Sequence, residues 1–320
     1  MLNVLLSALI IAFCLCSCSE TQKPYQPTSF SEDLLKKAEA GNAEAQLQIA
    51  GAYKEGRGVE KNAELAFQWA SKSADQGFPL AQIVMGESYY YGEGVEKNYQ
   101  KAFEYFKKAA ESGSAEGQFK LAGCYGYGIG TSKNDEEAVM WLKKAAKQKL
   151  PEAMRVLGKL YQDGNIVPKD LDLAFDYFTS ASELGDIYAQ MNLGFCYLNG
   201  LGVQKDPKKA LYWYTKSSLT GDANALQSLS QFYIKGIGTD KNLKKAYDLI
   251  KESAEKGNAE AQYNMAVFHS KGIEVPQNYL IAHQWCEKSA SQNNEDAKKL
   301  LTGLQFITKY NKNKSPTNPQ

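Results

Sequence analysis

The sequence contains few of the residues on which catalytic, metal-binding and nucleic-acid-binding sites depend. Two histidines, His269 and His283, and two arginines, Arg57 and Arg155, occur among 320 residues, and the formal net charge is +1. Without an excess of positive charge the chain has no general attraction for nucleic acid. Arginine supplies the forked donor that reads phosphate and guanine, and it is nearly absent. We therefore expect no nucleic-acid partner.

Motifs that support enzyme chemistry are also missing. No G-x-S-x-G, P-loop or S-x-x-K motif stands in a context that would support catalysis, and neither histidine has the neighbours of a zinc site or of a Ser-His-Asp triad. We interpret His269 as structural and His283 as a surface or interface residue. The sequence therefore predicts no enzymatic activity, no cofactor and no metal.

Cysteine is scarce in the body of the chain. Three of the six cysteines, Cys14, Cys16 and Cys18, lie close to the N-terminus, and the other three are far apart: Cys124, Cys196 and Cys286. An odd number at wide spacing is neither a disulfide framework nor a zinc motif. We expect these last three to be free thiols inside helices.

The N-terminal stretch 4–18 has no charged residue and consists of apolar or small side chains. It is short for a membrane-spanning helix and has the length of the apolar part of an export signal. Its end, Leu15-Cys16-Ser17-Cys18, resembles the bacterial lipoprotein signal, which implies cleavage before Cys18 and acylation of that residue. Two or three acyl chains anchor a protein firmly, whereas one chain binds only marginally.

This resemblance predicts a signal peptide over 1–17, then a lipidated Cys18 and a polar tether over 18–29. No Lys or Arg precedes the apolar stretch, so an uncleaved N-terminal membrane anchor is the alternative. In a host with two membranes, Ser19 in place of Asp favours the outer one under the sorting rule that the resemblance brings. We thus expect a protein of the bacterial cell envelope that is lipid-anchored and faces the periplasm.

From residue 45 the sequence repeats every 36 residues without a shift in register. Each repeat has a small residue, a large apolar residue four positions later, and a second small residue directly after it. Three positions further on stands a tyrosine or, once, His269. In the second repeat the four residues are Ala81, Met85, Gly86 and Tyr89. Spacings of three and four place them on one face of a helix, which we call helix A.

A glycine follows helix A in every repeat, as expected where the chain must adopt the left-handed conformation: Gly56, Gly92, Gly128, Gly164, Gly200, Gly236 and Gly272. A second glycine stands two positions later in five repeats. The fourth and seventh repeats have Ile166 and Glu274 there, each followed by Val-Pro. We therefore expect those two loops to take a different path.

Helix B begins near Asn62 and its equivalents. All seven repeats carry an alanine in it, with a large, mostly aromatic residue three positions later, as in Ala66 and Trp69. We expect the small residues of helix A to let helix B approach closely, while the aromatic residue fills the gap to the neighbouring repeat. One helical hairpin cannot bury both of its faces, but stacked hairpins share a continuous core.

Single helices flank the repeats. Residues 30–41 have the phase of a helix B and are predicted to form an N-terminal capping helix. A last helix A over Glu295 to Lys309 completes a repeat region that we place at 42–309. The polar end, 310–320, contains Pro316 and Pro319 and is predicted to be disordered.

This pattern resembles the Sel-1-like repeat family, a relative of the tetratricopeptide repeats, over roughly residues 30 to 309. The second repeat matches it at Ala81, Gly92-Glu93-Gly94-Val95, Lys97-Asn98, Lys101-Ala102 and Tyr105. The resemblance implies an all-α fold, a right-handed αα superhelical solenoid of seven 36-residue helix-turn-helix repeats with half-repeat caps. It also implies a scaffold that binds a protein or peptide in its concave groove, without identifying that partner.

In such solenoids helix A lines the groove, and the positions that vary between repeats should face it because packing does not determine them. Several of these positions carry large apolar or aromatic side chains, which are typical of binding surfaces. We expect eight residues to contact the partner: Tyr90, Tyr91, Phe119, Tyr127, Met191, Phe195, Leu198 and Tyr263. For each of them the alternative is burial by the curvature of the superhelix.

Four functions are compatible with the sequence. The first is an envelope scaffold or adaptor, and a sharper form of it is an immunity protein that neutralises an antibacterial toxin, as some exported lipoproteins of this family do. A hydrolase acting on cell-wall material or β-lactams is the third, but the branch of the family linked to that activity has cysteine pairs that this chain lacks. Glycan binding through tyrosines of the groove is the fourth. We favour the scaffold.

Overall fold

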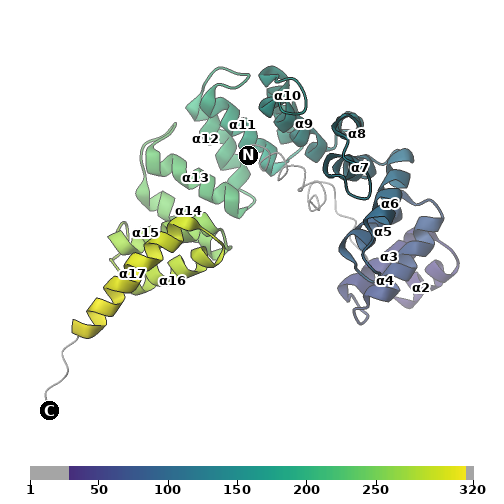
Figure 1. Cartoon of the computed structure of the whole chain (residues 1–320), viewed down its shortest axis with the longest axis horizontal. Coiled ribbons are helices and arrows are strands. Elements are labelled where there is room, and N and C mark those ends of the chain that lie inside the picture. Colours follow the sequence, from purple (N-terminus) through teal and green to yellow (C-terminus); the bar gives the residue numbers. More distant parts are fainter. Residues whose placement is uncertain (1–28, 315–320) are drawn as a thin grey trace, which may run out of the picture. The chain divides into compact units, whose positions relative to one another are not determined.

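The computed structural model describes residues 29–314, with side chains placed as far as Gln305, and this part of the chain is helical with no strand. Sixteen helices, α2 to α17, follow one another in chain order (Figure 1). The predicted αα solenoid fold is confirmed. The predicted signal peptide, Cys18 and the tether up to residue 28 lie outside the described residues.

Seven helix pairs keep the period of the sequence, since each helix A begins 36 positions after the one before it. The helices A are α3 (Ala43–Glu55), α5 (Pro79–Tyr91), α7 (Ala115–Tyr127), α9 (Pro151–Asp163), α11 (Ile187–Asn199), α13 (Ala223–Lys235) and α15 (Ala259–Lys271). The helices B are α4 (Ala63–Asp75), α6 (Tyr99–Glu111), α8 (Asp135–Lys147), α10 (Leu171–Glu183), α12 (Pro207–Ser218), α14 (Leu243–Glu255) and α16 (Tyr279–Ser291).

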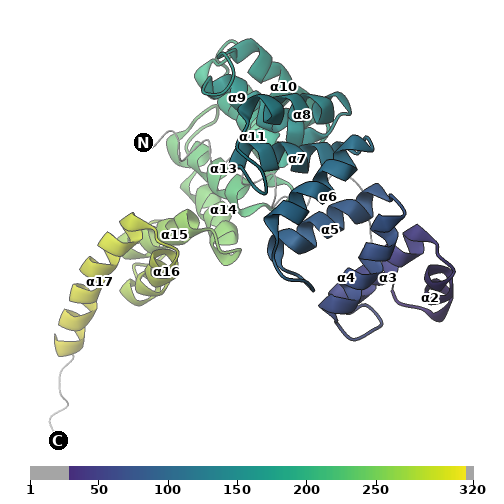
Figure 2. The ribbon, with the colours of Figure 1, turned by 45° about the vertical axis from the view of Figure 1, so that its right-hand side comes forward.

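Helices α2 (Glu32–Glu39) and α17 (Glu295–Lys314) flank these pairs, as predicted. In both views α17 extends past its neighbours α15 and α16 (Figure 1, Figure 2). It continues beyond the predicted end at Lys309 and includes residues 310–314. These residues are polar but contain no proline, and the first proline that could not continue the helix is Pro316.

The helices B begin where the sequence places an Asn or Asp. The Asn62 side chain accepts a hydrogen bond from the Leu65 backbone N–H at 2.9 Å, and all six equivalent residues cap their helices in the same way. This side-chain oxygen satisfies a backbone donor that the first turn of a helix leaves free. The local sequence thus determines where each helix B starts.

The loops after helix A test the prediction about Ile166 and Glu274. Ile166 does not adopt a positive φ, so the fourth loop departs from the others as predicted. Glu274 adopts a φ of 58°, and the Ile273 backbone N–H donates to the Phe268 carbonyl at 3.0 Å as its equivalents do in other repeats. The prediction is therefore wrong for the seventh loop, where backbone hydrogen bonds hold a non-glycine residue in the left-handed conformation.

Within each repeat the core pairs a small residue of helix A with a residue of helix B whose size complements it. Where helix A has glycine, helix B has an aromatic residue, and where helix A has Ala or Ser, helix B has a smaller one. The pairs in chain order are Ala50–Ala70, Gly86–Phe106, Ala122–Leu142, Gly158–Phe178, Gly194–Tyr214, Ser230–Ile250 and Ala266–Cys286. The summed volume is thus similar in five of the seven pairs, as close packing requires, whereas Ala50–Ala70 and Ala266–Cys286 fill less space.

The sequence analysis singled out a different residue of helix B, the one directly before the residue that faces helix A. This residue, Trp69 in the first repeat, is only partly buried. Trp69 packs against the cluster formed by α2 and α3, on the side of the preceding helix. Its outer face lies under the Lys72 ammonium, 3.9 Å from the ring centre, and Trp141 lies under Lys144 at 3.7 Å. The residue after it, such as Phe106, fills the space within the repeat, and the sequence interpretation missed that role.

Side-chain amides join consecutive repeats at the turns between helix B and helix A. The Gln148 amide donates to the Gly113 carbonyl at 2.9 Å and to the Gln118 side-chain oxygen at 2.9 Å. The seventh repeat has the same arrangement, with Gln292 donating to Gly257 and Gln262. These bonds connect residues 30 and 35 positions apart and satisfy carbonyls at the ends of the helices.

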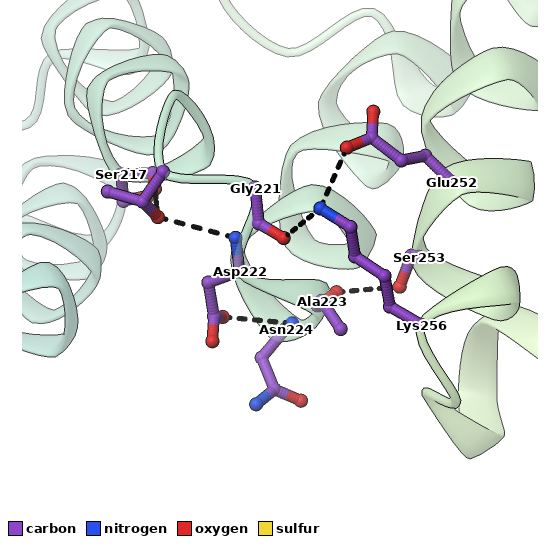
Figure 3. Close-up of polar contacts among 9 residues, drawn as sticks. Ser217, Gly221, Asp222, Ala223, Asn224, Glu252, Ser253 and Lys256 are labelled. Atoms are coloured by element: carbon purple, nitrogen blue, oxygen red, sulfur yellow. Dashed lines mark hydrogen bonds and ion pairs between the residues drawn. The ribbon is translucent and has the colours of Figure 1, made fainter. Parts of the chain in front are cut away.

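In the sixth repeat a lysine takes the place of that glutamine (Figure 3). The Lys256 ammonium donates to the Gly221 carbonyl at 2.6 Å and to Glu252 at 2.9 Å. The Ser253 hydroxyl donates to the Ala223 carbonyl at 2.6 Å, and Asp222 caps α13 by accepting from the backbone N–H of Asn224 at 3.0 Å. Different side chains thus satisfy the same junction between repeats.

The chain divides into two compact units, one ending at Asp186 and the other beginning at Ile187. The first contains α2 to α10 and the second α11 to α17.

Candidate binding surface on the helices A

The eight predicted contact residues differ in exposure. Tyr91 is 41% exposed and Phe195 is 44% exposed. The other six are half-buried or buried: Tyr90, Phe119, Tyr127, Met191, Leu198 and Tyr263. Four of the eight belong to the first unit and four to the second, so the structure offers two separate candidate surfaces.

Phe119 is a core residue. It is 3% exposed and packs among Val139, Leu142 and Val156, which come from its own repeat and the next. The equivalent residues Leu47 and Ile83 are also buried, because this position of helix A faces the neighbouring helix A. Its variation between repeats therefore reflects the volume of the core, and Phe119 is not available to a partner.

In the first unit the structure brings Tyr90 and Tyr91 together with Tyr99, a residue that sequence reasoning missed. We call these three residues the tyrosine cluster. The Tyr90 ring centre lies 4.8 Å from that of Tyr91 and 5.3 Å from that of Tyr99. Tyr99 is 45% exposed, and the Lys97 ammonium lies 5.8 Å from its ring centre. Tyr99 is the first residue of α6. An aromatic residue at the start of a helix was the feature of the sequence from which its exposure could have been predicted.

Tyr127, at the end of α7, stands at the same repeat position as Tyr91. It is partly buried and packs against the core of the third and fourth repeats. Tyr127 therefore contributes less exposed surface than its sequence position suggested.

In the second unit Phe195 is the exposed member of the predicted set. Met191 and Leu198 pack partly against the core cluster that contains Leu229, Phe232 and Tyr233, and Tyr263 packs against the cluster at the C-terminal cap. Phe195 thus projects from α11, while the other three lie at the boundary between core and surface.

The first unit also buries charged side chains on its helices A, which sequence reasoning did not identify as a site. The Lys120 ammonium, on α7, donates to Glu87 of α5 at 2.8 Å, and the Lys120 side chain is only 2% exposed. Glu116 of α7 and Glu152 of α9 lie within electrostatic reach of this pair. We call these four residues the Lys120 cluster. The feature of the sequence that could have indicated this cluster is Lys120 itself, because the other repeats have uncharged residues at its position.

The electrostatics of this cluster follow from burial and from an excess of carboxylates. Desolvation raises the pKa of Glu116, and the negative charges of Glu87 and Glu152 raise it further, while Lys120 acts in the opposite direction. Glu152 is 6% exposed, and one of its carboxylate oxygens, Oε2, is buried without a hydrogen-bond partner. A buried oxygen in that state is unusual in a folded protein.

One helical turn after Glu152, the Arg155 guanidinium pairs with Asp186. The distance from Arg155 Nε to Asp186 Oδ2 is 3.0 Å, and the two side chains are 9% and 7% exposed. This pair joins α9 to the turn that precedes α11. Arg155 has the repeat position of Phe119, 36 residues later, and the structure places it inside the repeat stack.

The three cysteines of the repeats and His269 lie where structural roles predict them. Cys124, Cys196 and Cys286 form no disulfide, as expected, and all three are buried. Burial raises the pKa of Cys124 to about 12 and that of Cys286 to about 11, so neither thiol forms a thiolate at neutral pH. His269 is 8% exposed and lies beside Tyr247, and desolvation lowers its pKa.

Within residues 29–314 the structure contains no group of three His, Cys, Asp or Glu side chains arranged to hold a metal ion. A search of the same residues found no helix with both the length and the apolar character that a membrane span requires.

Comparison with known proteins places the chain in a family. It matches the Sel1 repeat over seven consecutive segments: 43–78, 79–114, 115–150, 151–186, 187–222, 223–258 and 259–294. The protein therefore belongs to the Sel1 repeat family, whose members generally act as scaffolds for protein interactions. No curated protein matches the sequence.

Solved structures agree with this assignment. The c5321 protein of uropathogenic Escherichia coli, a protective antigen with the same fold, is 33% identical over 85% of this chain, with a TM-score of 0.70. The match covers 58% of the c5321 chain. A Sel1 repeat protein from Oxalobacter formigenes is 39% identical over 67% of this chain and 85% of its own, with a TM-score of 0.62.

A weaker likeness concerns the predicted immunity role. The immunity protein Pa5087 of Pseudomonas aeruginosa is 23% identical over 75% of this chain and 87% of its own, with a TM-score of 0.48. A likeness at this level does not extend from fold to function. Neutralisation of a toxin stays a prediction from the sequence.

Proposed function

We propose that this protein is an adaptor of the bacterial cell envelope that binds a protein or peptide partner through the exposed surface of its helices A. The tyrosine cluster of the second repeat is the principal contact. Binding is the proposed activity because the exposed residues that stand out on this surface are aromatic side chains. They do not form a nucleophile placed beside a base.

The observation that supports this proposal best is the exposure of Tyr91, at the end of α5, and Tyr99, at the start of α6, whose rings both contact that of Tyr90. Aromatic rings are costly to leave in water and are the residues most often found at binding hot spots. Tyrosine also carries a hydroxyl group that donates or accepts hydrogen bonds at the edge of an interface. A partner with an apolar anchor and a polar backbone would match this surface.

We further propose that Cys18 carries the lipid anchor and that the protein faces the periplasm from the outer membrane. Support comes from the sequence Leu15-Cys16-Ser17-Cys18 and the uncharged stretch before it. The similar Escherichia coli protein is a protective antigen, and an envelope location of this chain would be in line with such a role. The polar residues after Cys18 would separate the repeats from the lipid surface.

The binding proposal can be tested with the full-length protein expressed in its host and cross-linked before lysis. The variant Tyr91→Ser/Tyr99→Ser removes the exposed rings and leaves the core residue Tyr89 intact. The matched control is Tyr212→Ser, which removes a tyrosine that is 59% exposed on α12, a helix B. We expect one partner to be recovered with the native protein and with the control but lost from the double variant. Equal recovery with all three proteins would overturn the proposal.

The anchor is tested separately by replacing Cys18 with serine. We expect the native protein to incorporate radiolabelled palmitate and to fractionate with the outer membrane, and the variant to lose the label. Cys16→Ser is the control, because the resemblance places cleavage before Cys18. Retention of the label in Cys18→Ser would show that the anchor lies elsewhere or that the apolar stretch is left uncleaved.

A further inference from the structure

The formal net charge of +1 is the sum of two units of opposite charge. The second unit, residues 187–320, contains 17 Lys and 11 Asp or Glu, which gives a net charge of +6. The first unit contains the other 20 Lys or Arg and 25 Asp or Glu, a net charge of −5. Each unit therefore attracts surfaces whose charge has the sign of the other unit.

The sign changes at one repeat position on the helices B. Their second residue is Glu136 in α8 and Asp172 in α10, but it is Lys208 in α12 and Lys244 in α14. All four side chains are exposed. None of them takes part in an ion pair or a side-chain hydrogen bond within the part of the chain whose side chains are described. The fold thus leaves these four charges to the solvent.

The lysines at this position oppose the stability of their own helices. The first turn of a helix carries a partial positive charge, which carboxylates stabilise and ammonium groups destabilise. The first turn of α8 has three acidic residues. The first turns of α12 and α14 have none, and each contains a lysine pair, Lys208-Lys209 or Lys244-Lys245. Local helix stability therefore does not account for these lysines.

Packing brings the two lysine pairs together in the second unit. The loop that leads to α14 lies against the start of α12, because a Cβ atom on Gly238 would be 2.3 Å from the Pro207 carbonyl oxygen and 3.1 Å from the Lys208 backbone nitrogen. Residues 205–248 contain eight Lys but four Asp and no Glu, so nearby carboxylates leave this region positively charged. We call four exposed residues the lysine patch: Lys208, Lys209, Lys244 and Lys245.

The first unit carries the complementary charge on the corresponding elements. Exposed carboxylates project from α8 and α10, and α10 contains no Lys or Arg. Ile166 and Val167, in the loop that leads to α10, pack against the core cluster that contains Val139 of α8, which places the start of α10 beside α8. We call three exposed residues of these two helices the acidic patch: Glu136, Asp172 and Asp176.

We propose that the acidic patch of one copy of this protein binds the lysine patch of a second copy. The occupant is a second copy because the chain itself carries both complementary surfaces. Each patch consists of charges on two helices B that are one repeat apart, so the carboxylates and the ammonium groups have a similar spacing. Complementary charge of this kind speeds association and fixes the register of the two surfaces. The contact does not use the tyrosine cluster and goes beyond the proposed function.

Sedimentation equilibrium of the full-length protein in density-matched detergent tests the proposal. Exposed ion pairs contribute little each and are screened by salt. We therefore expect self-association with a micromolar Kd at low ionic strength, and association at least tenfold weaker in concentrated sodium chloride. A protein that stays monomeric at low ionic strength would overturn the proposal. Association that salt leaves unchanged would come from other surfaces and would overturn it as well.

Charge reversal locates the contact. The variant Glu136→Lys/Asp172→Lys has positive charge on both patches, and Lys208→Glu/Lys244→Glu has negative charge on both. Each variant alone should associate at least tenfold more weakly than the native protein, because its two patches repel. A mixture of the two variants should associate again, a result that misfolding of either variant cannot produce. A mixture that stays monomeric, or variants that each associate as the native protein does, would contradict the proposed contact.

The matched control is Glu64→Lys/Gln100→Lys, which places lysine at the same exposed repeat position in the first and second repeats. It should associate as the native protein does, and an equal loss in the control would show that no particular patch is involved. Phosphatidylglycerol vesicles test the other anionic surface that the lysine patch could meet. Salt-sensitive vesicle binding by a monomeric native protein, lost in Lys208→Glu/Lys244→Glu, would assign the lysine patch to a lipid surface and reject the second copy.

Discussion

The Phe106 ring occupies the space that any side chain on Gly86 would need. A Cβ atom on Gly86 would lie 2.5 Å from Phe106 Cε1, closer than van der Waals radii permit. Gly158 and Phe178 repeat the relationship two repeats later, at 2.8 Å. Glycine in these helices is therefore required by the aromatic residue that it faces.

Replacement of Gly86 by alanine should destabilise the protein despite the better helix propensity of alanine. Alanine gains about 1 kcal/mol as a helix former, whereas overpacking of a filled core costs about 1–3 kcal/mol. The second substitution Phe106→Leu should recover part of the loss, because it recreates the Ala122–Leu142 pair of the third repeat. Urea denaturation of both variants measures the free energy of unfolding.

The control is Gly303→Ala in α17, where a Cβ atom would meet nothing within 4 Å. There the helix propensity acts alone, and we expect stabilisation of about 1 kcal/mol. A Gly86→Ala protein as stable as Gly303→Ala would show that the Phe106 ring moves aside without cost.

Gly94→Ala should weaken the contact between the first two repeats. Gly94 has a φ of 71° and its missing Cβ would collide with the Ala63 carbonyl oxygen of the preceding repeat. Gly77→Ala provides the matched control, because Gly77 has a φ of 80° and open space around it. The control should cost about 1–2 kcal/mol for the left-handed conformation, and Gly94→Ala about 1–3 kcal/mol more for the collision. Equal losses of unfolding free energy would contradict the assigned contact.

Glu116→Gln should stabilise the protein at neutral pH. The raised pKa of Glu116 in the folded state means that ionising it costs the folded state more than the unfolded state. Native stability therefore falls as pH rises from the ordinary glutamate pKa through the higher folded value, and the loss is complete above it. The variant lacks this loss, so its advantage should be absent at acidic pH and grow as pH rises through that window.

Thermal unfolding between pH 4 and 8 measures the pH dependence of that advantage. Glu260→Gln is the control, because Glu260 has the repeat position of Glu116 but is exposed on α15. The groups that act on Glu116 are Lys120, Glu87 and Glu152. A difference between the native protein and Glu116→Gln that stays constant with pH would reject this account.

Asp186→Ala should be strongly destabilising because Arg155 would keep a buried charge without this carboxylate. Removing one partner of a buried ion pair typically costs about 3–5 kcal/mol. The double variant Arg155→Leu/Asp186→Ala should recover much of the loss, since the equivalent residue of the first repeat is the buried Leu47. A double-mutant cycle gives the coupling energy, and a coupling near zero would show that the pair does not act as a unit.

Much of the fold could be predicted from the sequence because its signals are local. Asn62 and its equivalents mark the starts of the helices B, and the glycines at positive φ mark the ends of the helices A. Lys149 and Asn293, which replace a glycine after helix B, take the same left-handed conformation. These local signals recur every 36 residues, so the same helix starts recur in every repeat.

The candidate site was predicted less well because variation between repeats does not distinguish surface from core. Phe119 varies because the volume between neighbouring helices A varies, so it lies in the core. Tyr99 belongs to a helix B and therefore fell outside a search confined to helix A. At Glu274 the residue type was a poor guide to the backbone. Hydrogen bonds of the loop hold it in the left-handed conformation, which residues other than glycine disfavour.

The sequence by itself determined the helices, their order and their period, because capping residues, glycines and apolar spacing act over a few neighbouring positions. Only the tertiary structure decided which side chains meet across repeats. Lys120 and Glu87 are 33 positions apart, and Arg155 and Asp186 are 31 apart. Such pairs depend on how one helical hairpin stacks on the next, so burial, charge and exposure at the candidate sites follow from packing.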